Sequence, residues 1–145
     1  MNTKKLLIGS VVGTVAVFLL DYLIYAVLLT DIFAPVPGCE RSPMPDFAWL
    51  IPGLFIVLFG FTYIYLKGVE GGSKVQQGIR YGLIFALIIG VGYNLIMYSL
   101  MTTHPLSYYL YDAVYNLVRW PIAGIVVAYA TGVPGTDRGK GPGGE

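Results

Sequence analysis

The stretch Tyr81–Met101 reads YGLIFALIIGVGYNLIMYSLM, which is 21 residues without a single Asp, Glu, Lys or Arg. About 20 consecutive apolar residues in an α-helix cross the roughly 30 Å hydrocarbon core of a bilayer. A soluble helix would instead alternate apolar and charged faces. This stretch therefore predicts a transmembrane helix, and it decides how the rest of the chain is interpreted.

Three further blocks have the same character, and they are Leu6–Thr30, Phe47–Leu66 and Leu106–Thr131. The chain has 145 residues, of which 56% are hydrophobic and 12% charged, and its mean hydropathy is +0.69. Soluble domains carry about twice that share of charge. The blocks are continuously apolar, and four alternating strands could not close a barrel, so helices are the remaining solution. We expect an all-α integral membrane protein.

The placement of lysine and arginine predicts the orientation of these helices. Seven basic residues lie before the first block, between the second and third, or after the fourth: Lys4, Lys5, Lys67, Lys74, Arg80, Arg138 and Lys140. Only Arg41 falls on the opposite side. Because basic loops stay in the cytoplasm, we expect an antiparallel four-helix transmembrane bundle in the inner (plasma) membrane with both termini cytoplasmic.

The predicted organisation is one domain over residues 1–132, followed by a disordered cytoplasmic tail over 133–145. The outer segment 31–46 contains four prolines, which disfavour regular helix. The segment Lys67–Ile79 contains four glycines and is expected to form the inner loop.

Small residues recur at every fourth position from just before the third block into its first half: Gly78, Gly82, Ala86 and Gly90. Such a ridge lets a second helix backbone approach closely, which is how helices associate in lipid. Packing inside the bundle is the first interpretation of this ridge, and a homodimer face is the alternative.

A set of polar residues falls at membrane depth, where charged groups are costly and usually face protein. Its members are Asp21, Asn94, Asp112, Asn116 and Arg119. From the 1.5 Å rise per residue, Arg119 lies near the middle of its helix and Asp21 lies within its reach. Asp112 is about 10 Å from Arg119 along the helix axis, a long reach for a direct bond.

We therefore predict an Asp21–Arg119 ion pair, with Asn94 and Asn116 bonding to it. Hydroxyl groups would come from nearby tyrosines, namely Tyr25, Tyr93, Tyr98 and Tyr115. This cluster could fix the packing and register of the helices, bind a small ligand, a lipid headgroup or a proton, or contact another subunit.

Other chemistry has little support in the sequence. His104 stands alone in a short turn, the single cysteine, Cys39, excludes an internal disulfide, and no metal, phosphate-loop or triad motif is present. Any cofactor remains unknown. A net charge of +1 argues against nucleic acid.

The runs Gly78-Ile-Arg-Tyr-Gly82, Tyr93-Asn-Leu-Ile-Met-Tyr98 and Leu29-Thr-Asp-Ile-Phe33 resemble small uncharacterised bacterial four-helix integral membrane proteins of the domain-of-unknown-function type. The resemblance covers most of residues 4–132. It implies the four-helix fold and brings no established activity with it.

The leading functional expectation is a non-enzymatic membrane protein that works by association, as an accessory subunit of a larger complex or as a homo-oligomer. Its partners would be lipid and other membrane subunits or further copies of itself. The alternative is a small transporter or a ligand- or lipid-binding protein with a polar pocket around Asp21 and Arg119.

Overall fold

The computed structural model describes residues 2–34, 45–70 and 72–132, and every regular element within these ranges is helical. Four helical spans are long and apolar enough to cross a membrane, so the chain is a multi-pass membrane protein by length and composition. The elements are α1 (Thr3–Asp21) with the π-helix η1 (Tyr22–Leu28); α2 (Phe47–Gly68); α3 (Lys74–Phe85), the π-helix η2 (Ala86–Gly92) and α4 (Tyr93–Leu100); and α5 (Leu106–Thr131). The predicted tail 133–145 and Cys39 lie outside the described residues.

The first turns of three helices are capped by polar side chains. Asn2 accepts hydrogen bonds from the backbone N–H groups at the start of α1, and Asp46 does so for α2. Ser73 accepts from the Gln76 N–H at the start of α3. Such caps satisfy backbone donors that have no partner within the helix. At the other end of the chain, α5 ends at Gly132, whose φ of 59° is the left-handed conformation that glycine adopts readily.

The third span starts earlier than the sequence indicated. The segment Lys67–Ile79 was expected to be a loop, but α2 continues to Gly68 and α3 already begins at Lys74. The cap at Ser73 starts the helix, and Gly78 is held within it by packing against the backbone of α5. Tertiary contact here outweighs the low helix propensity of glycine.

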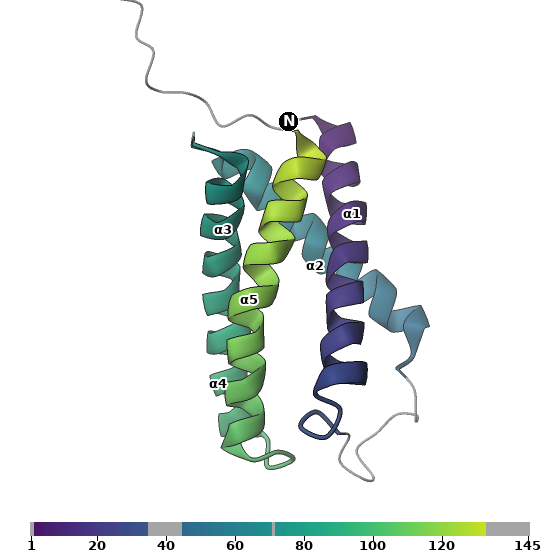
Figure 1. Cartoon of the computed structure of the whole chain (residues 1–145), viewed down its shortest axis with the longest axis vertical. Helices are drawn as coiled ribbons and strands as arrows, with labels where there is room; N and C mark the ends of the chain where they lie inside the picture. Colours follow the sequence, from purple (N-terminus) through teal and green to yellow (C-terminus); the bar gives the residue numbers. More distant parts are fainter. Residues whose placement is uncertain (1, 35–44, 71, 133–145) are drawn as a thin grey trace, which may run out of the picture.

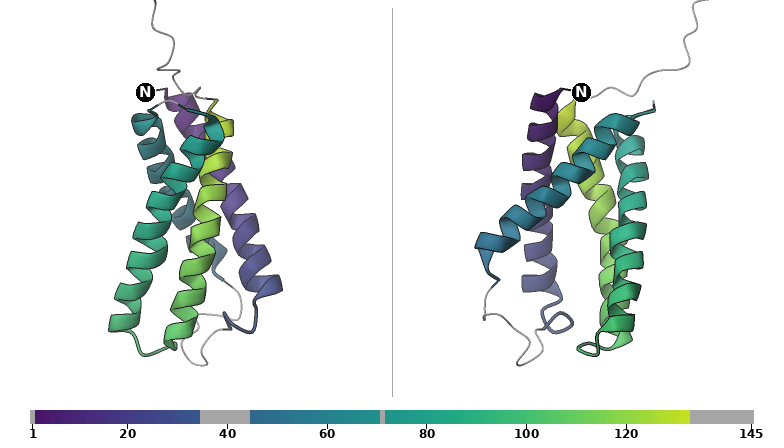
Figure 2. Two further views of the ribbon diagram at one scale, coloured as in Figure 1. Left: turned by 60° about the vertical axis from the view of Figure 1, so that its left-hand side comes forward. Right: turned by 180° about the vertical axis from the view of Figure 1, so that it is seen from behind.

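The helices are arranged around α5. In Figure 1, α1, α5 and the rod formed by α3, η2 and α4 lie side by side along the long axis, while α2 crosses behind them at an angle. The chain's first helix begins and α5 ends at the same end of the molecule. The two views in Figure 2 show that the first half of α2 departs from the other helices, whereas its second half rejoins them.

Close backbone contact between α3 and α5 follows the predicted ridge. A Cβ at Gly78 would collide with the backbone of Gly124, and a Cβ at Gly82 would collide with the backbone of Pro121. Further along the rod, Gly90 abuts the side chain of Asn116. The ridge is therefore covered by α5 within the same chain, and it is not free to form a homodimer face.

An aromatic core fills the space where α2 meets this helix pair. Phe61 of α2 contacts Phe85 edge-on, with ring centroids 4.7 Å apart, and lies 5.6 Å from Trp120. Phe61 and Trp120 are both almost completely buried. The burial of large aromatic rings fixes the second half of α2 against α3 and α5, close to the polar residues described next.

Candidate functional site

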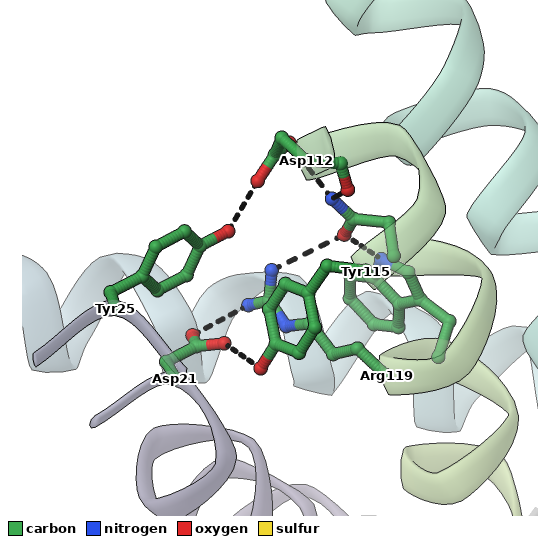
Figure 3. A network of polar contacts seen from close by, with 7 residues as sticks. Asp21, Tyr25, Asp112, Tyr115 and Arg119 are labelled. Carbon is green, nitrogen blue, oxygen red and sulfur yellow. Dashed lines mark hydrogen bonds and ion pairs between the residues drawn. The ribbon is translucent and has the colours of Figure 1, made fainter. Parts of the chain in front are cut away.

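Eight polar or aromatic side chains from three spans meet between α1, α4 and α5 and form what we call the polar network. Its members are Asp21, Tyr25, Asn94, Asp112, Tyr115, Asn116, Arg119 and Trp120. Figure 3 shows Asp21 and Tyr25 facing Asp112, Tyr115 and Arg119 across the space between the helices. All five residues that the sequence marked as a polar cluster belong to this network.

The depth of the network is nearly the same on every helix. Asp21 is seven residues before the end of η1, Asn94 is six before the end of α4, and Asp112 is six after the start of α5. At 1.5 Å per residue, each lies about 10 Å from that end of its helix. Polar side chains that lie at the same depth on neighbouring helices can form hydrogen bonds with one another. These bonds take the place of the bonds to water that exposed polar groups make.

The predicted ion pair between α1 and α5 is present. Arg119 donates from Nη2 to Oδ2 of Asp21 at 2.8 Å, and the Tyr115 hydroxyl donates to Oδ1 of the same carboxylate at 2.9 Å. The side chains of Arg119 and Asp21 are 13% and 23% exposed. A pair this deeply placed is weakly screened, and each partner would be costly to leave alone.

Asp112 binds differently from the prediction. Its carboxylate accepts from the Tyr25 hydroxyl, from Nδ2 of Asn94 at 2.6 Å and from Nδ2 of Asn116 at 2.9 Å. The prediction that Asn94 bonds to the ion pair is therefore wrong. The Asn94 amide lies nearer to Asp112, and Arg119 leans toward α1 instead. As expected, Asp112 makes no direct bond to Arg119.

Asn116 connects the two halves of the network. Its Oδ1 accepts from Nη1 of Arg119 at 3.3 Å and from Nε1 of Trp120 at 3.0 Å, while its Nδ2 serves Asp112. The guanidinium carbon lies 5.2 Å from the centre of the Trp120 ring, within the range of a cation–π contact. Trp120 was missed in the sequence, although its position four residues after Asn116 on one helix face could have indicated it.

Two of the four predicted tyrosines contribute hydroxyl groups. Tyr25 and Tyr115 bond to the two carboxylates, and their rings meet edge-on with centroids 5.3 Å apart. Tyr93 and Tyr98 are 54% and 43% exposed, and within the described ranges neither bonds to the network.

Each of the two π-helical segments borders the network. η1 begins immediately after Asp21 and carries Tyr25, while η2 contains Gly90 and ends two residues before Asn94. Nδ2 of Asn94, which donates to Asp112, also donates to the Gly90 carbonyl oxygen at 2.5 Å. Segments of π-helix are rare and occur often at functional sites. No hydropathy pattern marks them in the sequence.

Aromatic rings cover the end of the network nearest the 101–105 turn. Phe33, in the turn after η1, packs edge-on against Tyr25 at 4.6 Å and against Tyr108 at 5.2 Å. His104 stacks on Tyr108 with centroids 3.9 Å apart. His104 is thus a packed turn residue above the network.

The contacts that the network makes are hydrogen bonds and one ion pair. In the described part of the chain, no three residues of the types His, Cys, Asp and Glu are grouped as a metal site would require.

The comparisons with known proteins give no relative. No family model matches the chain, and neither a curated protein nor a solved structure matches it. The resemblance to small four-helix bacterial membrane proteins stays a prediction.

Proposed function

We propose that this chain is a non-enzymatic inner-membrane protein that works by association, as an accessory subunit of a larger complex or as a homo-oligomer. In this proposal the spans form an antiparallel bundle with both ends of the chain in the cytoplasm, as the basic residues favour. The polar network would then hold the bundle together, which leaves other surfaces for partners.

The exposure of the first half of α2 is the observation that supports this proposal. All four buried residues of α2 (Leu58, Phe61, Thr62 and Tyr65) lie in its second half. In the first half, Trp49 is 71% exposed, and among the described residues no atom beyond Gly53's own stretch of helix lies within 4 Å of the position that a Cβ on Gly53 would occupy. A membrane helix that departs from its own bundle and exposes a glycine offers a surface on which another helix can pack closely.

Native mass spectrometry of the tagged protein, extracted gently from its host membrane, tests this proposal. We expect a defined assembly that is larger than the monomer. The Gly53→Leu variant should lose it without losing fold, because the added side chain meets open space. Val118→Leu, which also enlarges a side chain on the outer surface, at a residue 55% exposed on α5, serves as the control. A wild-type protein that stays monomeric would reject association.

A second candidate is a small transporter or ligand-binding protein that uses the polar network. The observation favouring it is the carboxylate of Asp112, whose hydrogen-bond donors among the described residues are all neutral, in a network that holds two acids and one base. A purely structural pair would not require this second acid.

Water access to the network distinguishes the two candidates. In a Cys39→Ser background, Asp112→Cys places a thiol in the network itself and should react with a small water-soluble thiol reagent if a pore or pocket reaches this position. Val114→Cys, which is 62% exposed on the apolar surface, should stay unreactive, because a thiol in lipid does not ionise. Equal and negligible reaction at both positions would reject a hydrated pocket.

A further inference from the structure

Basic side chains gather at one end of the bundle. Figures 1 and 2 show that α1 and α3 begin, and α2 and α5 end, at this end. Against a single acid, Glu70, the basic residues that the described part of the chain places there are Lys4, Lys5, Lys67, Lys74 and Arg80. The tail 133–145 adds two acids and two basic residues, so it leaves this excess of positive charge unchanged. We call this set of five basic residues and Glu70 the basic end.

The acid of the basic end neutralises an arginine and leaves the lysines to an external anion. Nη1 of Arg80 lies 2.7 Å from Oε2 of Glu70, and both side chains are more than half exposed. Within the described ranges none of the four lysines forms an ion pair. Four ammonium groups at one end of a membrane protein are therefore available to bind an anion.

Two of these lysines lie over tyrosine rings on the outer surface of the bundle. Nζ of Lys67 is 5.9 Å from the centre of the Tyr63 ring, and Nζ of Lys74 is 5.4 Å from the centre of the Tyr129 ring. The two tyrosines are 41% and 59% exposed. They lie five residues before the end of α2 and two before the end of α5, within about 8 Å of those ends at 1.5 Å per residue.

The two rings place the ammonium groups at the level of the lipid headgroups. Tyrosine near the end of a membrane span lies at the boundary between hydrocarbon and headgroups. A lysine that contacts such a ring keeps its charge at this boundary while its stem covers apolar surface. A contact with one ring face still leaves N–H donors of the ammonium for phosphate oxygens.

We propose that the basic end binds the headgroups of anionic phospholipids, chiefly through Lys67 and Lys74, with Lys4 and Lys5 at the start of α1 adding to the attraction. The charge of the site is complementary to that of the lipid, because lysine binds phosphate as a positive point charge. Basic residues next to a membrane span attract anionic lipids in the same way.

The surface beside these lysines favours a lipid over an acidic protein. Ile64 precedes Lys67 by three residues on α2, so it lies on the same side of the helix, and it is 47% exposed. The occupant must therefore cover apolar surface and bring a negative charge to the ammonium at the same time. A phospholipid does both, since its acyl chains lie along the helix and its phosphate lies at the end.

This inference goes beyond association and does not depend on it. The first half of α2, which supports association, lies away from the basic end in both views of Figure 2. The variant Gly53→Leu therefore changes one surface, and substitution of the lysines changes the other.

Electron spin resonance of spin-labelled lipids tests the inference. The full chain is placed in phosphatidylcholine vesicles with a trace of phospholipid that is spin-labelled on its acyl chain and has a phosphatidylglycerol or a phosphatidylcholine headgroup. The fraction of label slowed by the protein gives the relative association constant of the two lipids. One lysine near the membrane surface favours an anionic lipid by about fivefold, so the average over both leaflets should be about threefold. In about 1 M NaCl, where the Debye length is about 3 Å, most of this preference should disappear.

Two charge-matched pairs of variants locate the site. Lys67→Gln/Lys74→Gln should lose most of the preference, and Lys4→Gln/Lys5→Gln, which removes the same charge, should lose less because no ring contact positions these lysines among the described residues. Lys67→Arg/Lys74→Arg keeps the charge and should keep the preference. Circular dichroism checks that each variant retains its helices. An equal or larger loss from the pair at Lys4 and Lys5 would overturn the assignment to Lys67 and Lys74.

The wild-type protein alone can overturn the inference. Equal association of the two lipids at low salt, or a preference that high salt leaves unchanged, would do so without any variant. An acidic protein that co-purifies with the wild type and not with Lys67→Gln/Lys74→Gln, in the absence of a lipid preference, would assign the basic end to a protein partner instead. None of these results bears on Gly53→Leu, so lipid binding and association can fail separately.

Discussion

Neutralising the Asp21–Arg119 pair one partner at a time should give unequal losses of stability. Removing one partner of a buried ion pair costs about 3–5 kcal/mol. The side chains here are 13% and 23% exposed, which places the cost of Arg119→Gln at the lower end, about 3 kcal/mol. This variant leaves two carboxylates without a base.

Asp21→Asn should cost less, about 2 kcal/mol, for two reasons. Its amide oxygen still accepts from the Tyr115 hydroxyl, which lies 2.9 Å from Oδ1. The remaining charges, on Arg119 and Asp112, have opposite signs, and Asn116 bridges them.

The double variant Asp21→Asn/Arg119→Gln isolates the interaction between the partners. Residues in one ion-pair network have coupling energies of about 0.5–3 kcal/mol. We expect the double variant to lose about 1.5 kcal/mol less than the two single losses together. The charge-swapped variant Asp21→Arg/Arg119→Asp should recover part of the loss, limited by the Tyr115 and Asn116 contacts that it misdirects.

The assay is reversible unfolding in mixed micelles of a mild detergent and sodium dodecyl sulfate, followed by tryptophan fluorescence and circular dichroism. The charge-preserving variant Arg119→Lys is the control and should lose less than Arg119→Gln. Strict additivity within about 0.5 kcal/mol, or a larger loss for Asp21→Asn than for Arg119→Gln, would refute the reasoning.

Three further variants or labels test other parts of the structure. Gly82→Ala should destabilise the protein by about 2–3 kcal/mol, because the added Cβ meets the backbone of α5. Gly53→Ala should be neutral or stabilise it by up to about 1 kcal/mol. Equal effects of the two variants in the unfolding assay would contradict this packing. Tyr25→Phe should cost about 1.5–3 kcal/mol through the lost hydroxyl bond to a carboxylate, with its ring contacts retained, and an unchanged stability would reject that bond. In intact cells an impermeant maleimide should label native Cys39 and fail to label Ser73→Cys in a Cys39→Ser background, and the opposite pattern would invert the proposed topology.

The sequence alone was sufficient to predict the features that depend on the lipid surroundings of each segment. The number and type of spans follow from hydropathy, because an apolar run of about 20 residues has one stable form in lipid. The range Leu106–Thr131 coincides with α5, and Phe47–Leu66 differs from α2 by two residues. The pairing of Asp21 with Arg119 could also be predicted, since both lie at similar depth and few other charges were available.

Contacts between helices decided the rest. Asn94 serves Asp112 instead of Arg119 because the turn of each helix about its own axis, which depth alone does not specify, sets which side chains face each other. The start of α3 at Lys74, the position of Trp120 and the choice of α5 as the partner of the glycine ridge likewise depend on packing. Hydropathy records the preference of each single residue for lipid and can be read without knowing its neighbours in space. The features above depend on contacts between pairs of helices, and these contacts exist only once the chain is folded.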